Sequence, residues 1–435
     1  MSFVTDIFRG HKFSIIMLYI ATFIMRFAAY MAIALLSYMV DVIPRAFIIA
    51  FYSLTEILTV SFFGVSADRR GRRPVLIVSH LLTTIGVALF AILAFIQGAV
   101  ETKDLFIILV VYFPLMGILG AGAASKVAST MTMIADESTI ETRAQYMGFF
   151  DLATLGGFAA GLATGHVFQA ALEIEIGISF IIAVVVVVIS LIMVYYLVDE
   201  TLNPDELTKA QENEIKNSEF LTRVLQVVRT NKDLQKILPV YIPMISLYGL
   251  LVAYAKELAE DELGGGISPD LIFVAIILGT TMGVSMILSG KLSDTKLVRR
   301  PFIIIGLISL AILIILFRLF SVEAGGEGSF NGLLTYWPIT ALLGFGVGMF
   351  PPAILAYLTD ISKKDTRGTM FGVYSVIFGS GMIIGPLIGS LFAEIGRIYD
   401  AEIWGLVIAV VLLVLLSSVG TLFIEEKAKD SIELT

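Results

Sequence analysis

The stretch that decides the fold is Gly64-Val-Ser-Ala-Asp68-Arg-Arg-Gly71-Arg72-Arg73-Pro74, a charged loop between two long apolar runs. A degraded copy, Gly290-Lys-Leu-Ser-Asp294-Thr-Lys-Leu-Val-Arg299-Arg300-Pro301, lies between two later apolar runs. The two aspartates are 226 residues apart, about half the length of the chain. This spacing indicates a repeat unit of about half the chain.

A second signature recurs at almost the same spacing. Asp136 and Arg143 reappear 224 residues later as Asp360 and Arg367, and a serine, a threonine and a glycine around them recur with the same offset. One match would mean little, whereas five matches at one offset indicate an internal duplication.

The composition indicates a membrane protein. Hydrophobic residues make up 57% of the chain, charged residues only 15%, and the mean hydropathy is +0.93, far from the values of an ordinary soluble domain. The net charge of −8 predicts no nucleic-acid partner, because no basic face is gathered in the sequence. The chain has no cysteine, which excludes disulfides, thiolate metal sites and cysteine nucleophiles.

Apolar runs of about 20 residues, the length that crosses a bilayer, occur twelve times. We therefore expect an all-α integral membrane protein with two pseudo-symmetric bundles of six transmembrane helices each. The expected helices are 13–37, 46–66, 75–97, 105–134, 144–168, 174–198, 237–255, 270–291, 301–319, 333–358, 367–391 and 403–424.

The duplication also predicts the domain organisation, namely an N-terminal bundle over 1–198, a cytoplasmic linker over 199–236 and a C-terminal bundle over 237–435. Most of the 29 lysines and arginines fall on one side of this topology. Basic residues stay on the cytoplasmic side of a membrane, so we expect a multi-pass plasma-membrane protein with both termini in the cytoplasm. Both charged loops then lie on the same face, as a parallel repeat requires.

With twelve expected helices and two copies of the loop, the chain resembles the major facilitator superfamily of secondary transporters. This resemblance implies a cytoplasmic gate in which Asp68 faces the start of helix 11 near Arg367, and Arg72 reaches Asp136. Changes at Thr295 and Val298 predict a weaker contact in the second copy. Alternatively, these charges only fix the topology and tie loops together. The gate residues implied are Gly64, Asp68, Gly71, Arg72, Asp136, Arg143, Asp294, Asp360 and Arg367.

Subfamily features point in different directions. The acidic segments 198–201 and 424–427 faintly resemble motifs of sugar porters, but helix 7 lacks the glutamine pair expected in those proteins. Helix 4 lacks the arginine motif and helix 5 the Gly-Pro motif expected in drug/proton antiporters. The resemblance therefore assigns no substrate class.

Four ionisable residues fall inside expected helices, where a charge costs about 2.5–3.5 kcal/mol on insertion scales. Counting about 1.5 Å per residue from the cytoplasmic ends puts Arg26 and Glu56 at about 21 and 18 Å, and Lys126 and Asp151 at about 15 and 12 Å. We expect Arg26 to pair with Glu56, and Lys126 with Asp151. Both pairs could be purely structural. Alternatively, Arg26 and Lys126 contact an anionic or polar solute while Glu56 or Asp151 takes up a coupling proton, because arginine keeps its proton.

Aromatic residues extend this candidate site. Tyr30 lies about one helical turn after Arg26, and the second half offers Tyr248 in helix 7 and Trp337 and Tyr357 in helix 10. In the family that the chain resembles, helices 1, 4, 7 and 10 line the central cavity. Packing or anchoring at the membrane interface is the alternative role for each aromatic side chain.

The sequence therefore predicts a secondary active transporter, most simply a proton-coupled symporter of a small organic anion or sugar-like solute. The alternatives are a proton-driven drug or metabolite efflux antiporter, a uniporter or, from another class, a transport-silent membrane sensor. With three histidines, no cysteine and no HExxH, GxSxG or GxxxxGK[ST] motif, we expect neither an enzyme nor a nucleotide-driven pump. We expect no cofactor or metal. The expected partners are a small solute, protons and the lipid bilayer, and the protein is expected to be a monomer.

Overall fold

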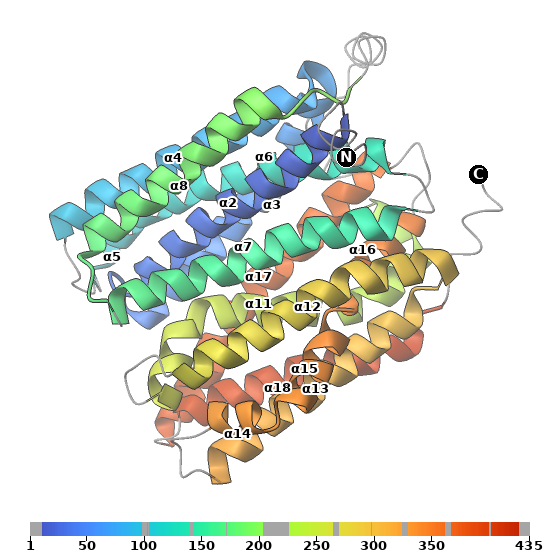
Figure 1. Ribbon diagram of the computed structural model, residues 1–435. Coiled ribbons are helices and arrows are strands. Elements are labelled where there is room, and N and C mark those ends of the chain that lie inside the picture. Colours follow the sequence, from blue (N-terminus) through green and yellow to red (C-terminus); the bar gives the residue numbers. More distant parts are fainter. Residues whose placement is uncertain are drawn as a thin grey trace, which may run out of the picture.

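The computed structural model describes residues 11–97, 102, 104–138, 142–170, 172–202, 226–263, 269–296, 298–323, 329–361, 367–399 and 402–425. Within these ranges the backbone is almost entirely helical (Figure 1). Eleven described helices are long and apolar enough to cross a membrane, and the stretch Arg300–Leu316 of a further helix is also apolar. The all-α membrane fold predicted from the twelve apolar runs is therefore confirmed.

The helices of the first half follow the predicted runs closely, with ends that extend a few residues further in most cases. The expected fourth helix contains a short π-helical segment, η1, between α5 and α6. The elements are α2 (His11–Leu36), α3 (Val42–Arg70), α4 (Arg72–Gln97), α5 (Leu105–Ile107), η1 (Ile108–Tyr112), α6 (Phe113–Glu137), α7 (Arg143–Ala170) and α8 (Ile176–Leu197).

The second half repeats this pattern with one exception, the expected helix over 333–358. Its elements are α11 (Lys232–Leu263), α12 (Pro269–Lys296), α13 (Arg300–Glu323), α14 (Ser329–Thr335), α15 (Trp337–Val347), α16 (Phe350–Asp360), α17 (Arg367–Ile398), α18 (Glu402–Gly420) and η4 (Thr421–Phe423).

The span expected over 333–358 is found as Trp337–Leu358, but the run is not one continuous helix, because the chain breaks at Tyr336 and at Gly348–Met349. Proline follows each break, at Pro338 and at Pro351–Pro352. Proline lacks an amide hydrogen and is accommodated in the first turn of a helix, so each proline site favours a new helix start.

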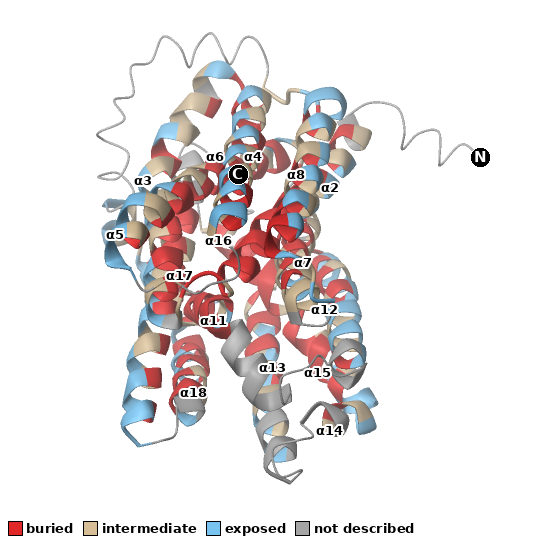
Figure 2. Cartoon of the chain, turned by 90° about the vertical axis from the view of Figure 1, so that its left-hand side faces the viewer, coloured by how far each residue is buried: buried red, intermediate tan, exposed pale blue. Residues whose placement is uncertain are grey.

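Within the first half, α2 packs against α7 and α8, and α6 packs against α3 and α4. Within the second half, α11 packs against α17 and α18, and α13 packs against α15 and α18. The halves meet mainly where α3 lies against α17 and α7 against α12 and α16. Figure 2 shows buried surfaces turned toward the middle of the bundle and exposed, largely apolar ones on its outside, as expected of a chain surrounded by lipid.

Close packing of α2 and α7 depends on a glycine. A Cβ atom at Gly157 would lie 2.9 Å from the Cβ atom of Arg26. Small residues let transmembrane helices approach this closely. Gly157 thus fixes how near Arg26 lies to α7.

One end of the bundle, which we call the linker end, collects the segments that flank 203–225. Asp199, after α8, donates its backbone N–H to Ser14 Oγ at the start of α2 over 2.7 Å. Lys236 Nζ, near the start of α11, lies 2.7 Å from Glu425 Oε1 after η4. The starts of α2 and α11 therefore share this end with the ends of α8 and η4. The division into domains at 198 and 236 stays a prediction.

Candidate functional site

Four helices of the first half bring the predicted charged residues into one buried group. Arg26 lies on α2, Glu56 on α3, Lys126 on α6 and Asp151 on α7, and their exposed fractions are 3%, 1%, 0% and 5%. Electrostatic interactions connect Glu56 with Arg26 and Lys126, and connect Lys126 with Arg26 and Asp151. We call these four residues the charged cluster.

The cluster does not consist of the two ion pairs expected from helix depth. Between its basic and acidic members, all of which the structure describes, no N–O distance is within 4.0 Å. Arg26 Nη1 instead donates to Tyr52 Oη over 3.2 Å, and neither carboxylate oxygen of Glu56 has a hydrogen-bond partner. Depth along a helix fixes the height of a residue, whereas the direction of its side chain is set by the rotation of the helix.

Lys126 is the most enclosed member of the cluster. Its Nζ atom has no hydrogen-bond partner and lies 5.3 Å from the centre of the Phe150 ring, within the range of a cation–π contact. Asp151 Oδ2 also has no hydrogen-bond partner. The cluster therefore holds ionisable groups that the protein itself leaves largely without hydrogen-bond partners.

Aromatic side chains surround Arg26. Its guanidinium carbon lies 5.8 Å from the centre of the Tyr30 ring, which packs edge-to-face on Phe158 at 4.5 Å. Tyr30 thus lies beside the cluster, as expected from its position about one helical turn after Arg26. Tyr52, which accepts the hydrogen bond from Arg26, was not among the residues expected from sequence.

The second half contributes phenol groups that face Asp151 across the junction between the halves. Tyr241 and Tyr248 of α11 and Tyr374 of α17 all interact electrostatically with its carboxylate. The ring centres of Tyr241 and Tyr374 are 6.1 Å apart. The sequence pointed to Tyr248. It gave no reason to choose Tyr374, because helix 11 was not expected to line the site.

The two aromatic residues expected from helix 10 lie in different environments. Tyr357 is fully buried on α16. Trp337 begins α15, directly after the break at Tyr336, and 56% of it is exposed. The structure therefore does not bring Trp337 to the buried cluster, and its position fits the interfacial role that the sequence left open.

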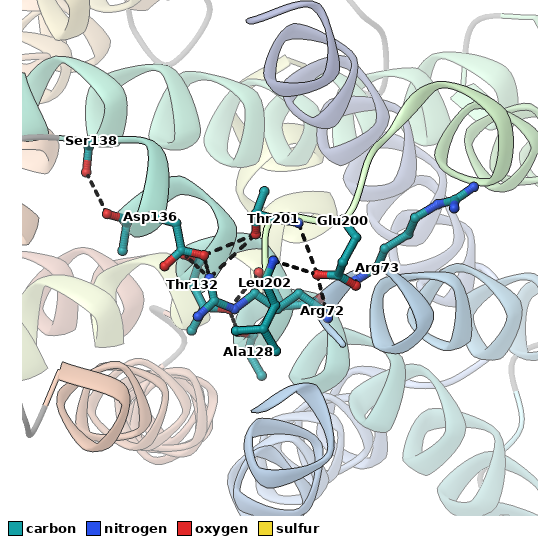
Figure 3. A network of polar contacts seen from close by, with 11 residues as sticks. Arg72, Arg73, Ala128, Thr132, Asp136, Ser138, Glu200, Thr201 and Leu202 are labelled. Carbon is teal, nitrogen blue, oxygen red and sulfur yellow. Dashed lines mark hydrogen bonds and ion pairs between the residues drawn. The ribbon is translucent and has the colours of Figure 1, made fainter. Parts of the chain in front are cut away.

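At the linker end, Arg72 forms an ion pair with Asp136, the contact that the family resemblance implies (Figure 3). Glu200, which sequence reasoning did not select, binds the same loop. Its two carboxylate oxygens accept the backbone N–H groups of Arg72 and Arg73 over 3.1 and 3.0 Å. A carboxylate is favoured at a helix N-terminus, so Glu200 ties the end of α8 to the start of α4.

Gly71 lies between these groups with φ +96°, a conformation that side chains other than glycine rarely adopt. A Cβ atom there would lie 2.5 Å from Glu200 Oε2. Gly64 is different, because a Cβ atom at that position meets nothing within 4 Å. The side chains of the other gate residues named in this half, Asp68 and Arg143, and that of Arg367 lie outside the described residues.

The second copy of the loop forms an intact ionic contact despite its altered sequence. Arg299 lies 2.9 Å from Asp294 Oδ1 and 2.9 Å from Asp360 Oδ2, and Asp294 Oδ2 accepts the backbone N–H of Gln145 over 3.0 Å. Burial would lower the pKa of Arg299, but the charges of Asp360 and Asp294 outweigh burial and raise it. This geometry gives no sign of the weaker contact that the changes at Thr295 and Val298 led us to expect.

Because Gln145 lies in the first turn of α7 and Asp294 in the last turn of α12, this contact joins the two halves at the linker end. A different contact joins them at the opposite end. Arg45 is buried near the start of α3, and its Nε donates to the carbonyl oxygen of Ala253 in α11 over 3.2 Å. Its Nη1 donates to Ser37 O, also over 3.2 Å. The halves therefore touch at both ends in this conformation.

Among the described residues, no group of three or more histidine, cysteine, aspartate or glutamate side chains is arranged to hold a metal ion. The polar groups near the junction of the halves can bind a charged or hydroxylated solute and can exchange protons.

Three bacterial proteins are similar to this chain over more than four fifths of its length. Multidrug resistance protein 2 of Bacillus subtilis (strain 168) is 25% identical over 373 residues, 84% of this chain and 83% of the relative. Proton-coupled antiporter flippase LtaA of Staphylococcus haemolyticus (strain JCSC1435) is 25% identical over 413 residues, 94% of each chain. Tetracycline resistance protein, class E, of Escherichia coli is 24% identical over 366 residues, 82% of this chain and 80% of the relative.

Solved structures share the fold at lower identity. The human organic anion transporter MFSD10 (TETRAN) superposes with a TM-score of 0.68 at 15% identity, covering 96% of this chain and 100% of the other. The proton:xylose symporter XylE superposes with a TM-score of 0.67 at 14% identity, covering 97% and 99%.

The sequence model of the Major Facilitator Superfamily matches residues 18–325 and 266–434, which together take in nearly the whole chain. The repeated loops, the helical fold and this match agree. The chain belongs to the Major Facilitator Superfamily and is a secondary transporter.

Proposed function

We propose that this transporter couples the movement of protons to that of a small organic anion, by symport, with the charged cluster as the shared site. The observation that carries the proposal is the burial of Arg26, Glu56, Lys126 and Asp151 in one group without ion pairs between them. Buried charges are expensive unless they are paired, so the cluster favours a bound partner that supplies charge and hydrogen bonds.

Whether the solute moves in the same direction as the proton or in the opposite direction follows from the charge of the solute. A proton added to Glu56, Asp151 or Lys126 makes the cluster more positive, which raises its affinity for an anion and lowers its affinity for a cation. By linkage, a bound anion raises the affinity for the proton to the same extent. Anions are therefore expected to travel with protons, and cations to exchange against them.

The tyrosines of the second half complete the proposed site. Tyr241, Tyr248 and Tyr374 present phenol groups toward Asp151, and such groups bond hydroxyl or carboxylate oxygens and pack on apolar carbon. We expect the cluster to bind the charged part of the solute and the tyrosines to contact the remainder.

Antiport of a cationic or amphipathic drug is a second candidate, and the relatives favour it. Multidrug resistance protein 2 and a tetracycline resistance protein match more than 80% of this chain, and LtaA is named a proton-coupled antiporter. Under this alternative, Glu56 and Asp151 bind the cation and the proton in competition.

We further propose that the protein lies in the plasma membrane as a monomer with its linker end in the cytoplasm. The contact of Asp294 with Gln145 then acts as part of a cytoplasmic gate, and the contact of Arg45 with Ala253 closes the outer side. Alternating access requires each contact to break in turn as the halves rock.

The test is uptake into proteoliposomes of radiolabelled organic acids, sugars and lipophilic cations under pH gradients of either direction. Symport predicts that an anion accumulates when the interior is alkaline, and that a protonophore abolishes the accumulation. Accumulation of a cation with an acidic interior would instead establish antiport. If no solute class responds to either gradient, proton coupling is wrong.

A further inference from the structure

Lys126 occupies an environment that favours a neutral amine. Its side chain is fully enclosed on α6, and the protein offers its Nζ atom no hydrogen-bond acceptor. An ammonium group carries three donors, and burying them unsatisfied is far more costly than burying an amine. The Phe150 ring, 5.3 Å away, offers partial compensation for a charge but no hydrogen-bond acceptor of the strength that an ammonium requires.

The titratable groups that interact with Lys126 lie on four neighbouring helices, α2, α3, α4 and α7. Arg26 adds a like charge, which further disfavours an ammonium, whereas Glu56 and Asp151 favour it. His80 of α4 also interacts with Lys126 electrostatically. Neither carboxylate lies within 4.0 Å, so neither supplies the hydrogen bonds that an ammonium requires.

The two basic residues of the cluster differ in what they can do. The guanidinium of Arg26 keeps its proton in proteins and already donates to Tyr52 over 3.2 Å. Lysine gives up its proton readily when it is buried, and it regains the proton when a partner returns. Arg26 therefore supplies a permanent charge, and Lys126 supplies one that depends on its surroundings.

We propose that Lys126 carries the coupling proton of this transporter. The inference rests on the proposed symport of an organic anion and assigns its proton to one atom, Nζ. In the conformation described here the group is a neutral amine. When a solute carboxylate reaches the cluster, its oxygens supply acceptors, and the amine takes up one proton from the solution on that side of the membrane to become an ammonium paired with the anion.

This assignment explains why proton and anion travel together. If the anion binds without the proton, the cluster carries an extra negative charge. If the proton binds without the anion, the cluster contains an ammonium group without hydrogen-bond acceptors. Each species alone makes closure of the site unfavourable, whereas together they form a neutral, hydrogen-bonded pair. Sequence reasoning considered only Glu56 and Asp151 as carriers, because burial of the Lys126 amine without acceptors becomes visible only in the structure.

Lys126→Arg separates charge from proton release, because guanidinium keeps the positive charge but cannot give up its proton. In proteoliposomes, K126R is expected to retain exchange of labelled anion across the membrane and to lose at least about 10-fold of the accumulation driven by an alkaline interior. K291R makes the same exchange at an exposed lysine of α12, outside the cluster, and is the matched control that is expected to keep accumulation. The exposed-site variant E173Q controls for general effects of removing a carboxylate.

Wild-type accumulation by K126R would overturn the assignment. So would the reverse pattern, in which E56Q or D151N abolishes accumulation and K126R keeps it, because the proton would then travel on a carboxylate. If K126R does not fold, K126H decides, since imidazole titrates at lower pH than an amine. Accumulation by K126H is expected with its pH profile displaced to lower pH, and an unchanged profile overturns the proposal.

Failure of this inference is distinguishable from failure of the proposed function. If the wild-type protein accumulates no anion under either gradient, anion symport itself is wrong. If the wild-type protein accumulates an anion and K126R matches it, only the role of Lys126 is wrong.

Discussion

Arg45 and Ala253, 208 residues apart in the chain, are joined by a 3.2 Å hydrogen bond that links α3 of the first half to α11 of the second. The donor is a charged guanidinium buried away from solvent, and the acceptor is a backbone carbonyl oxygen. Hydrogen bonds to charged groups contribute about 1.5–3 kcal/mol, more than those between neutral groups. This contact therefore contributes measurably to the free-energy difference between the conformation that forms it and one in which it is broken.

Replacing Arg45 with methionine is expected to favour opening at the end opposite the linker. Loss of about 1.5–3 kcal/mol shifts the conformational equilibrium by roughly 10- to 100-fold. Since the chain has no native cysteine, single cysteines introduced at that end report opening through their labelling rate. K291M, at an exposed lysine on α12, is the control. Equal labelling rates in R45M and the wild type would show that Arg45 does not restrain opening.

Asp294→Asn is expected to favour opening at the linker end instead. The amide removes the charge that Asp294 presents to Arg299 and to the N–H of Gln145, and so weakens the contact between α12 and α7. The expected shift is about 10-fold or more, measured by spin-label distances between the linker ends of these two helices. T295A, at the exposed neighbouring residue, should leave the distances unchanged. A distance distribution for D294N that matches the wild type contradicts this role.

Gly71→Ala is expected to destabilise the protein. The left-handed backbone of Gly71 costs a residue with a Cβ atom about 1–3 kcal/mol, and the new methyl group also meets Glu200. Thermal unfolding in detergent should show a clear loss of stability. G64A is the matched control, because open space surrounds its Cβ position, and its unfolding temperature should stay close to that of the wild type. Equal stability of the two variants would show that the loop relaxes without cost.

Tyr374→Phe is expected to weaken solute binding with little effect on folding. The variant keeps the ring that packs against Tyr241 and Phe378 and removes the hydroxyl that faces Asp151 and Arg26. Loss of one hydrogen bond of about 1–1.5 kcal/mol raises the half-saturating solute concentration about 5- to 10-fold. Uptake at graded solute concentrations measures this change, with Y399F at an exposed position as control. An unchanged concentration dependence would place Tyr374 outside the site.

Sequence predicted the fold well, because hydrophobic runs of bilayer length and a repeated loop are direct signals of helix number and duplication. It also predicted a polar cluster of Arg26, Glu56, Lys126 and Asp151 in the first half, and these four residues interact electrostatically in the structure. It did not predict how their side chains turn, since helix rotation depends on packing contacts such as that between Gly157 and α2. The structure describes all four residues of the cluster, and the expected ion pairs do not form between them.

Two further features differ from what the sequence predicted, the break in the helix expected over 333–358 and the position of Tyr374. The first has a cause that is visible in the sequence, although hydropathy alone does not show it. Pro351 and Pro352 sit inside an apolar run that reads as one helix, although proline favours the start of a new one. Tyr374 carried no such signal, because only the packing of α17 beside α11 and α3 brings it toward Asp151. Long-range placement of this kind depends on tertiary structure.

The contacts of Arg45 and Asp294 at opposite ends have a kinetic consequence. If opening toward either side breaks one contact and keeps the other, the conformation closed at both ends is the only one that holds both. Weakening both equally would therefore leave the ratio of inward- to outward-facing molecules unchanged while reducing the population closed at both ends. The two contacts together set the dwell time of a solute sealed inside the protein, independently of the direction in which it travels.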